Sequence, residues 1–476
     1  MKKFLIISLI TLLVLVVLMA GLLFTQFGND LVKPYLKAEL EKEIGLPTEV
    51  ETFKLRYDHT ILDIIIDKGL KVDVASDFNL LDQSFEGTYK IYANNFVYEG
   101  IKLDEANING EYKGVPDDLV VNGKGTSFNA PLKYDLRVLN GEAKEITFYI
   151  KDFAVSDILA LAKQPALAKG KVDANLTMPA IPKENLKENL KANLKVNLDN
   201  VTFNNDLIKK HYKVVLPESL VAQGNVDANL SGNEVLAMVA MQTKLSTTAL
   251  VNLNLDQLKV NTKSKHLSTD YMVNILDLKS LSDLLKTKLS GVLVLKGKVK
   301  KTDTLLVTGM TDSLGGTIDY TLEDKAFDAT LSAMPMQNML EMFSFPPFVD
   351  ANTSGKIAYD LLHKKGNIKL ALGDFKLAPN DVTKVLETVM PISPTDIVFG
   401  SSTLDATLDG DEVIYNLMAK ASEAHISIGD GRINRETKEH EATMEFGFNK
   451  YAIAGTIGGS IRNPRIGFDT KGFLKD

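Results

Sequence analysis

The chain has 476 residues, a formal net charge of −7 and no cysteine. The acidic balance removes the electrostatic basis for binding nucleic acid, and the lack of cysteine excludes thiolate catalysis, disulfides and cysteine-ligated metals. Tryptophan is absent and aromatic residues make up 7% of the chain, which is less than a large compact core ordinarily uses.

An uncharged apolar stretch, Phe4–Phe24, lies near the start of the chain, and only Ser8 and Thr11 in it are polar. As a helix, these roughly 21 residues span about 31 Å, which matches the hydrocarbon core of a bilayer. Lys2 and Lys3 precede the stretch, so the positive-inside rule places the N-terminus in the cytoplasm. The sequence therefore predicts a single-pass transmembrane anchor over residues 1–28, with the rest of the chain on the far side of the membrane.

A cleaved signal peptide is the alternative interpretation of this stretch. Its apolar region would be shorter, about 7–15 residues, and would end in a pair of small residues that flank the cleavage site. Here Ala20 and Gly21 are followed directly by Leu22, Leu23 and Phe24. The sequence around this position is a poor cleavage site, which favours a retained anchor.

The segment after the anchor predicts a short amphipathic helix over Asn29–Ile44. Gly45 and Pro47 mark its end, so residues 29–47 form the predicted capping segment. A helix that lies on the membrane is the alternative, but the polar face mixes Glu and Lys instead of being basic. We therefore expect the helix to plug the end of the first β-layer through one apolar face, made of Leu31, Tyr35, Leu36, Leu40 and Ile44.

From Thr48 onward the dominant pattern is a series of short strands that alternate apolar and polar residues. In Val251–Val260 the alternation changes parity at Asp256-Gln257, which predicts a β-bulge. There is no strand–helix alternation of the doubly wound kind. The clearest predicted strands are Lys71–Val74, Thr88–Tyr92, Asn193–Phe203, Val251–Val260, Val292–Val299 and Thr403–Leu408.

An irregular internal repeat organises this β-rich region. Gly170–Leu176 reads GKVDANL and Gly224–Leu230 reads GNVDANL, with looser copies at Gly355–Leu361 and Leu404–Leu408. Most copies follow a strand end, a short helix and a break in the chain. The predicted helices are Ile158–Ala162 (capped by Ser156-Asp157), Leu281–Leu285, Met336–Phe343 and Asp381–Val389.

Each repeat strand has one apolar face, and one such strip cannot bury that face alone. Successive strips can join edge to edge into a single curved sheet. The apolar positions form either the lining of a groove or an ordinary dry core. They are Val172, Ala174, Leu176, Val226, Ala228, Leu230, Leu404, Ala406 and Leu408.

Motifs for catalysis and for metal or cofactor binding are missing from the sequence. No HExxH pair, G-x-S-x-G elbow, complete phosphate loop or complete calcium loop occurs. Gly455–Gly459 lacks the strand–GxGxxG–helix setting of a dinucleotide site. We therefore predict a protein that is not an enzyme and that uses no cofactor or metal.

Three segments carry a family resemblance. Val32–Val50 (VKPYLKAELEKEIGLPTEV) has Pro-Tyr-Leu near a helix start and then a Gly-x-Pro turn into the first strand. The strand–helix–strand repeat is clearest in Phe153–Leu176. Gly455–Thr470 (GTIGGSIRNPRIGFDT) joins a glycine-rich strand to Asn-Pro and a further strand. In these features the chain resembles the AsmA-like family of inner-membrane-anchored periplasmic proteins, although it is shorter than the largest members and its repeats vary in length.

The resemblance implies a mainly β fold, in which an N-terminal transmembrane helix precedes an elongated, curved, repeat-built antiparallel β-sheet trough with a few short helices. Residues 48–476 would form this trough. With strands about 4.8 Å apart, roughly 25–35 strands would extend about 120–170 Å.

The implied location is the inner membrane, with the bulk of the chain in the periplasm. AsmA-like proteins are similar to bridge-like lipid transfer proteins, so the implied function is to hold phospholipid acyl chains in an apolar groove. Lipid would then move between the inner and outer membranes and support outer-membrane homeostasis. The implied partners are phospholipid, the inner membrane and an outer-membrane or periplasmic protein. The alternative is a periplasmic scaffold or assembly factor for outer-membrane proteins, with a closed dry β core.

Overall fold

A computed structural model describes residues 22–469, apart from residues 80, 99–100, 182–185, 215, 247, 286, 380–382, 385–386, 389–392, 450 and 461–462. The predicted anchor, Phe4–Phe24, lies outside the described residues except for its last three positions. Within the described ranges, no helix combines the length and the apolar character that crossing a membrane requires.

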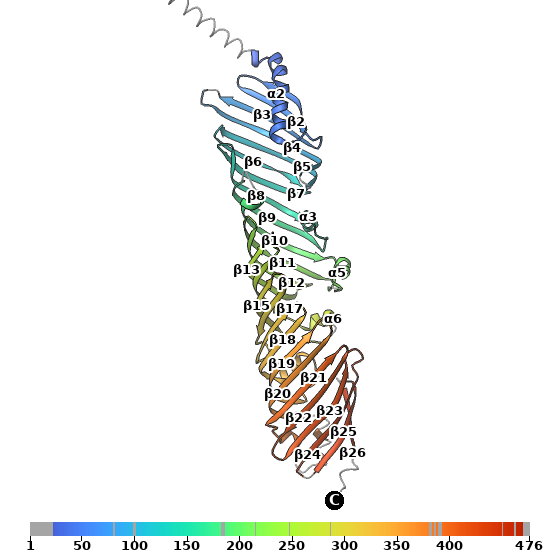
Figure 1. Ribbon diagram of the computed structural model, residues 1–476. Coiled ribbons are helices and arrows are strands. Elements are labelled where there is room, and N and C mark those ends of the chain that lie inside the picture. Colours follow the sequence, from blue (N-terminus) through green and yellow to red (C-terminus); the bar gives the residue numbers. More distant parts are fainter. Residues whose placement is uncertain are drawn as a thin grey trace, which may run out of the picture. The chain divides into compact units, whose positions relative to one another are not determined.

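The described chain is mainly β, and its 26 strands belong to one antiparallel sheet with a few short helices (Figure 1). This confirms the predicted fold class at that level, and the strand number falls within the expected range. The chain divides into two units, Met1–Leu236 and Ala237–Asp476, whose boundary falls in strand β12 (Glu234–Leu245).

Unit 1 contains a run of hairpin-connected strands interrupted by short helices. Its elements are α2 (Gln26–Ile44), β1 (Thr48–Leu55), β2 (His59–Ile66), β3 (Leu70–Asn79), β4 (Ser84–Tyr98), β5 (Ile101–Val115), β6 (Asp118–Ser127), β7 (Ala130–Leu139), β8 (Glu142–Ala154), α3 (Val155–Leu161), β9 (Ala168–Ala180), α4 (Leu186–Asn189), β10 (Lys191–Phe203), α5 (Asn205–Tyr212) and β11 (Leu220–Ser231).

Unit 2 repeats this plan. Its elements are β13 (Thr248–Asn261), β14 (Leu267–Ile275), η1 (Lys279–Leu281), α6 (Ser282–Leu285), β15 (Leu293–Lys301), β16 (Leu305–Thr311), β17 (Thr317–Glu323), β18 (Ala326–Pro335), α7 (Met336–Met342), β19 (Val349–Asp360), β20 (Lys365–Leu377), η2 (Pro394–Asp396), β21 (Ser401–Asp409), β22 (Glu412–Lys420), β23 (Ala424–Asn434), β24 (His440–Phe448), β25 (Tyr451–Ser460) and β26 (Asn463–Asp469).

Local turn chemistry and bulges fix the register of these hairpins. Asn140 and Gly141 connect β7 to β8 with φ values of 50° and 73°, which is the two-residue turn that matches the twist of paired strands. The predicted bulge in β13 is confirmed, because its pairing with β14 shifts between Asp256 and Lys259 and Gln257 has a φ of 50°. The bulge keeps apolar residues on one face after the parity of the sequence changes.

The short helices connect strand ends, as predicted, but their bounds differ. α3 begins at Val155 with Ala154 as its N-cap and no side-chain cap, so the predicted Ser156-Asp157 cap is wrong. α5 was not predicted from the sequence; Asn204 caps it by accepting a hydrogen bond from the Leu207 amide at 3.4 Å. The predicted helix Asp381–Val389 falls largely outside the described residues.

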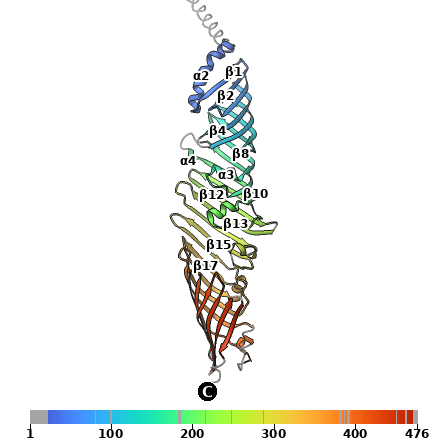
Figure 2. The same ribbon diagram turned by 90° about the vertical axis from the view of Figure 1, so that its right-hand side faces the viewer.

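Helix α2 covers the edge of strand β1, as the predicted plug requires (Figure 2). The side chain of Asn29 forms two hydrogen bonds with the backbone of Leu55, and the Lys33 ammonium donates to the carbonyl of Glu51 at 2.9 Å. Leu40 and Ile44 pack against the apolar cluster of the first strands. A helix that satisfies these backbone groups protects an edge strand from pairing with another chain.

The prediction that the apolar residues of α2 share one face is wrong for the N-terminal half of the helix. α2 starts at Gln26, where the N-cap Thr25 accepts a hydrogen bond from the Gly28 amide, and ends at Ile44, where the C-cap Gly45 has a φ of 72°. Leu31 and Tyr35 are 57% and 75% exposed, so they do not join Leu40 and Ile44 on the sheet.

Replacing Asn29 by alanine is expected to loosen the edge of β1. The Leu55 amide donates to Asn29 Oδ1 at 2.8 Å, and Asn29 Nδ2 donates to the Leu55 carbonyl at 3.2 Å. Without the Asn29 side chain, the amide and the carbonyl of Leu55 both lose their hydrogen-bond partner. This should lower the free energy of unfolding by about 1–3 kcal/mol and speed hydrogen exchange at the Leu55 amide. Asp30→Ala, on an exposed neighbour, is the control. Unchanged exchange at Leu55 would contradict the edge-pairing role.

Candidate functional site

A continuous row of apolar positions crosses all eleven strands from β1 to β11 in unit 1. Each member lies opposite the next in the strand register. One face of the sheet therefore presents an unbroken apolar line perpendicular to the strands. We call it the first apolar row: Val50, Ile64, Val72, Ile91, Ile108, Gly125, Leu132, Ile150, Ala174, Val196 and Val226.

The first apolar row is only partly removed from solvent. Val50, Ile64, Leu132 and Ile150 are buried, and the other members are half-buried. The opposite face is mostly polar, as in the Lys195–Asp227 ion pair, whose charged atoms lie 3.6 Å apart. Apolar side chains in the middle of a sheet are usually covered by a second layer, so half-burial along most of the row leaves an apolar surface accessible.

Unit 2 contains an equivalent second apolar row across the eleven strands from β13 to β23. Consecutive members again lie opposite one another, and the alanines are buried while most others are half-buried. The second apolar row consists of Leu255, Tyr271, Gly297, Gly309, Tyr320, Ala329, Ile357, Ile368, Ala406, Tyr415 and Gly431.

The nine predicted lining residues all lie within the sheet, and none of them is fully exposed. Val172, Ala228 and Ala406 are at most 9% exposed, and the other six are half-buried. The register places Ala174 and Val226 in the first apolar row and aligns Leu176 with Ala228 through Leu194. Val172 and Leu230 flank these positions in β9 and β11, while Leu404, Ala406 and Leu408 lie together in β21 of unit 2.

Strand β10 supplies further residues of the apolar face that were not selected from the sequence. Leu194 and Val196 stand between the β9 and β11 positions in the register. The alternation in Asn193–Phe203 predicted this strand, but only the pairing shows that it separates the two matching repeats. The apolar positions of β10 were therefore already visible in the alternation of this strand.

Two tyrosines lie over two glycines on the apolar face of unit 1, and we call this group the first tyrosine bridge. Tyr89 faces Gly110, Gly110 faces Gly123, and Gly123 faces Tyr134 on the successive strands β4 to β7. The two tyrosine hydroxyls meet at 2.5 Å, and the Tyr89 hydroxyl also donates to the carbonyl of Asn122 at 2.8 Å.

The second tyrosine bridge has the same construction on β14 to β17 of unit 2. Its members are Tyr271, Gly297, Gly309 and Tyr320, and the two hydroxyls lie 2.6 Å apart. In both bridges the glycines leave room for the rings. A Cβ at Gly123 would lie 2.6 Å from the Tyr134 ring, and a Cβ at Gly309 would lie 2.6 Å from the Tyr320 ring. Glycine is required because the rings lie against the sheet.

Burial keeps the hydroxyls of Tyr89 and Tyr320 neutral. Removal from water raises the pKa of Tyr89 and of Tyr320 above the usual range, and the hydrogen bond between the hydroxyls adds to the effect. Each bridge therefore joins strands that are three positions apart without placing a charge on the apolar face. At each bridge the apolar face therefore consists of aromatic rings that lie on glycine backbone, and the tyrosine hydroxyls are hydrogen-bonded to each other.

Tyr415 and His440 form a third buried polar pair, in unit 2. The Tyr415 hydroxyl and His440 Nε2 are 2.7 Å apart, and His440 is 8% exposed. Burial raises the pKa of Tyr415 to about 12 and lowers the pKa of His440. The tyrosine therefore stays protonated and donates to the neutral imidazole.

Acid is expected to destabilise unit 2 through His440. Because burial lowers the folded-state pKa of His440, the unfolded chain binds more protons below about pH 6.5, and stability falls as the pH drops from there toward the folded-state pKa. Thermal unfolding between about pH 7.5 and 5 should show a steeper loss for the natural protein than for His440→Gln, which keeps an acceptor but does not titrate. Parallel pH profiles would contradict this role.

Unit 2 also contains a dry core. Thirteen buried side chains from β18 to β25 and the segment before β21 form one cluster, and each is at most 8% exposed. The rings of Phe375 and Phe399 pack edge to face with their centroids 5.7 Å apart, and Phe446 is 1% exposed. This part of the apolar face is closed, in contrast to the half-buried first apolar row.

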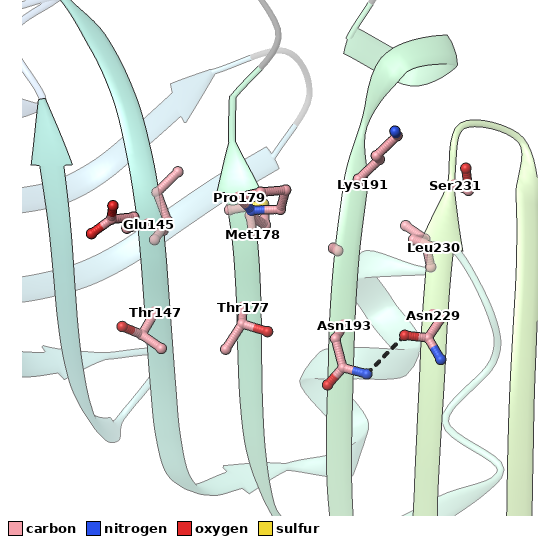
Figure 3. A pocket seen from close by; sticks show the side chains of 12 residues that line it. Glu145, Thr147, Thr177, Met178, Pro179, Lys191, Asn193, Asn229, Leu230 and Ser231 are labelled. Carbon is pink, nitrogen blue, oxygen red and sulfur yellow. Dashed lines mark hydrogen bonds between the residues drawn. The ribbon is translucent and has the colours of Figure 1, made fainter. Parts of the chain in front are cut away.

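A pocket of about 590 Å³ lies on the other face of the sheet, at the ends of β8 to β11 (Figure 3). Thr147, Thr177, Asn193 and Asn229 lie side by side in register and alternate with the apolar positions. Asn193 Nδ2 donates to Asn229 Oδ1 at 3.0 Å. The pocket lining also includes the charged side chains of Glu145 and Lys191 and apolar residues such as Met178 and Leu230, so it mixes polar and apolar character.

Nothing in the described ranges gathers three or more His, Asp or Glu side chains into an arrangement that could hold a metal ion. Compared with known proteins, the chain matches no protein-family model and no curated protein.

Proposed function

We propose that this protein is a membrane-anchored, bridge-like carrier that holds phospholipid acyl chains on its apolar face and helps move lipid between the inner and outer membranes. The observation that carries the proposal is the first apolar row, which crosses eleven strands while most of its side chains stay half-buried. The resemblance to AsmA-like proteins and the apolar Phe4–Phe24 stretch support the same function and an inner-membrane location with the bulk of the chain in the periplasm.

The mechanism follows from the uniformity of the apolar row. Burying a methylene group stabilises a bound chain by about 0.8 kcal/mol, and neighbouring strands offer equivalent Val, Ile, Leu and Ala contacts. An acyl chain can therefore shift from one strand to the next with little net change in free energy, while its headgroup stays in water. The direction of movement has to come from the supply or consumption of lipid at the two membranes.

A closed scaffold for outer-membrane proteins is the second candidate. It is favoured by one observation, the dry cluster around Phe375, Phe399 and Phe446 in unit 2. In the carrier interpretation this cluster closes one part of the sheet and stabilises it. In the scaffold interpretation the whole apolar face would be covered.

Photo-cross-linking in cells tests the proposal. p-Benzoylphenylalanine at Val226 should capture radiolabelled phospholipid, because Val226 belongs to the first apolar row. The same group at Asn225 is the matched control, because the neighbouring residue points to the opposite, exposed face. Equal labelling at both positions, or no lipid at Val226, would contradict the carrier function.

A further inference from the structure

Helix α2 has a second apolar face, which does not contact the sheet. Phe27, Leu31 and Tyr35 follow one another at four-residue spacing, so they share one side of the helix. They are 70%, 57% and 75% exposed. Pro34 and Ala38 extend the same stripe and are also exposed. We call these five residues the outer stripe of α2.

The outer stripe lies on the side of α2 opposite the residues that hold the sheet. Asn29 and Lys33 bond to the backbone of β1, and Leu40 and Ile44 pack on the first strands. With about 3.6 residues per turn, these contacts fall roughly half a turn away from Leu31. The helix therefore carries two separate apolar faces, and only one of them is used within the described part of the chain.

We propose that the outer stripe lies in the headgroup region of a lipid bilayer, so that α2 holds the start of the sheet at the membrane surface. The inference rests on the proposed membrane anchor. The apolar Phe4–Phe24 stretch ends just before α2, and its last residues, Leu22 to Phe24, are the first described residues of the chain. Leu22 and Leu23, which precede α2, are themselves 51% and 45% exposed.

The chemistry of the stripe suits an interface better than open water. Tyr side chains are enriched where membrane and water meet, and helices with an apolar face that contains Phe and Leu bind there by burying this face at the headgroup boundary. The polar surface of α2 carries both Glu and Lys, so attraction to anionic lipid alone would not bring the helix to a membrane. This surface is compatible with a helix that the preceding anchor already brings to the bilayer. α2 then lies between the membrane and β1, where the first apolar row begins.

Spin labelling of the full chain tests this inference, and the natural absence of cysteine makes single-site labelling clean. Nitroxides would be placed at Phe27→Cys, Leu31→Cys and Tyr35→Cys in vesicles of phosphatidylethanolamine and phosphatidylglycerol. Asp30→Cys is the matched control, because it is exposed at the same level of the helix on another side. Val14→Cys reports on the anchor itself.

The readout is collision with oxygen, which enters the bilayer, and with a water-soluble nickel chelate, which does not. We expect nickel accessibility at Phe27, Leu31 and Tyr35 to be about tenfold lower than at Asp30, with oxygen access retained. If the labels at Phe27, Leu31 and Tyr35 are accessible to nickel while the label at Val14 is protected, this inference is overturned and the proposed anchor is not. A water-exposed Val14 label would overturn the anchor and the proposed function with it. Stripe labels protected from both reagents would show a protein partner and also overturn the inference.

Discussion

Gly123→Ala is expected to lift the Tyr134 ring off the sheet and obstruct the apolar face. A Cβ at this position would lie 2.6, 2.7 and 2.8 Å from three atoms of the Tyr134 side chain, which is closer than non-bonded atoms can approach. The ring has to rotate away, and the hydroxyl contact with Tyr89 is lost. Overpacking of this kind lowers the free energy of unfolding by about 1–3 kcal/mol.

Cross-linking on both sides of the first tyrosine bridge measures the obstruction. If lipid enters from the anchored end, capture by p-benzoylphenylalanine at Val226 should fall in Gly123→Ala, while capture at Val72 should persist. Adding Tyr134→Ala removes the displaced ring and should restore capture at Val226 without restoring stability. Gly400→Ala is the control, since a Cβ there meets nothing within 4 Å. Lipid capture at Val226 equal to that of the natural protein would show that the ring does not obstruct the apolar face.

A charge on the apolar face is expected to have opposite consequences at half-buried positions and in the dry cluster of unit 2. Leu230→Glu in β11 places a carboxylate at a half-buried position, where it can still reach water. We expect a stability loss within about 0.5–3 kcal/mol and a large loss of lipid capture at the neighbouring Val226. Leu408→Glu, also half-buried, should keep the fold of unit 2 for the same reason.

Phe446→Glu supplies the contrast. Phe446 is 1% exposed within the dry cluster, so the substitution creates a cavity and buries an unpaired charge. Its cost should exceed about 4 kcal/mol and unfold unit 2, as hydrogen exchange would show. Asn229→Glu is the control, because it adds the same charge at an exposed position on the polar face, where we expect no effect on folding. If Leu230→Glu unfolds its unit as Phe446→Glu does, the face in unit 1 is a closed core, and the scaffold function is favoured instead.

The sequence by itself determined the local features of this protein. Alternation of apolar and polar residues identified the strands, as in Val251–Val260 with its bulge, because successive side chains on a strand point to opposite faces. The matching repeats Gly170–Leu176 and Gly224–Leu230 identified which face is apolar. The end of α2 directly before Gly45 followed from the left-handed conformation that glycine adopts easily.

The tertiary structure decided what depends on register and on solvent access. Tyr89 and Tyr134 are 45 residues apart in the chain, and nothing local indicates that two glycines from intervening strands lie between them. The half-burial of Val226 and the full burial of Phe446 also have no local signature, since both residues occupy apolar positions of alternating strands. Leu31 and Tyr35 share a helical pattern with Leu40, but the contacts of α2 with β1 divided them between two faces. The exposure of a side chain depends on which segments pack against it, and the pairing between distant strands determines which segments these are.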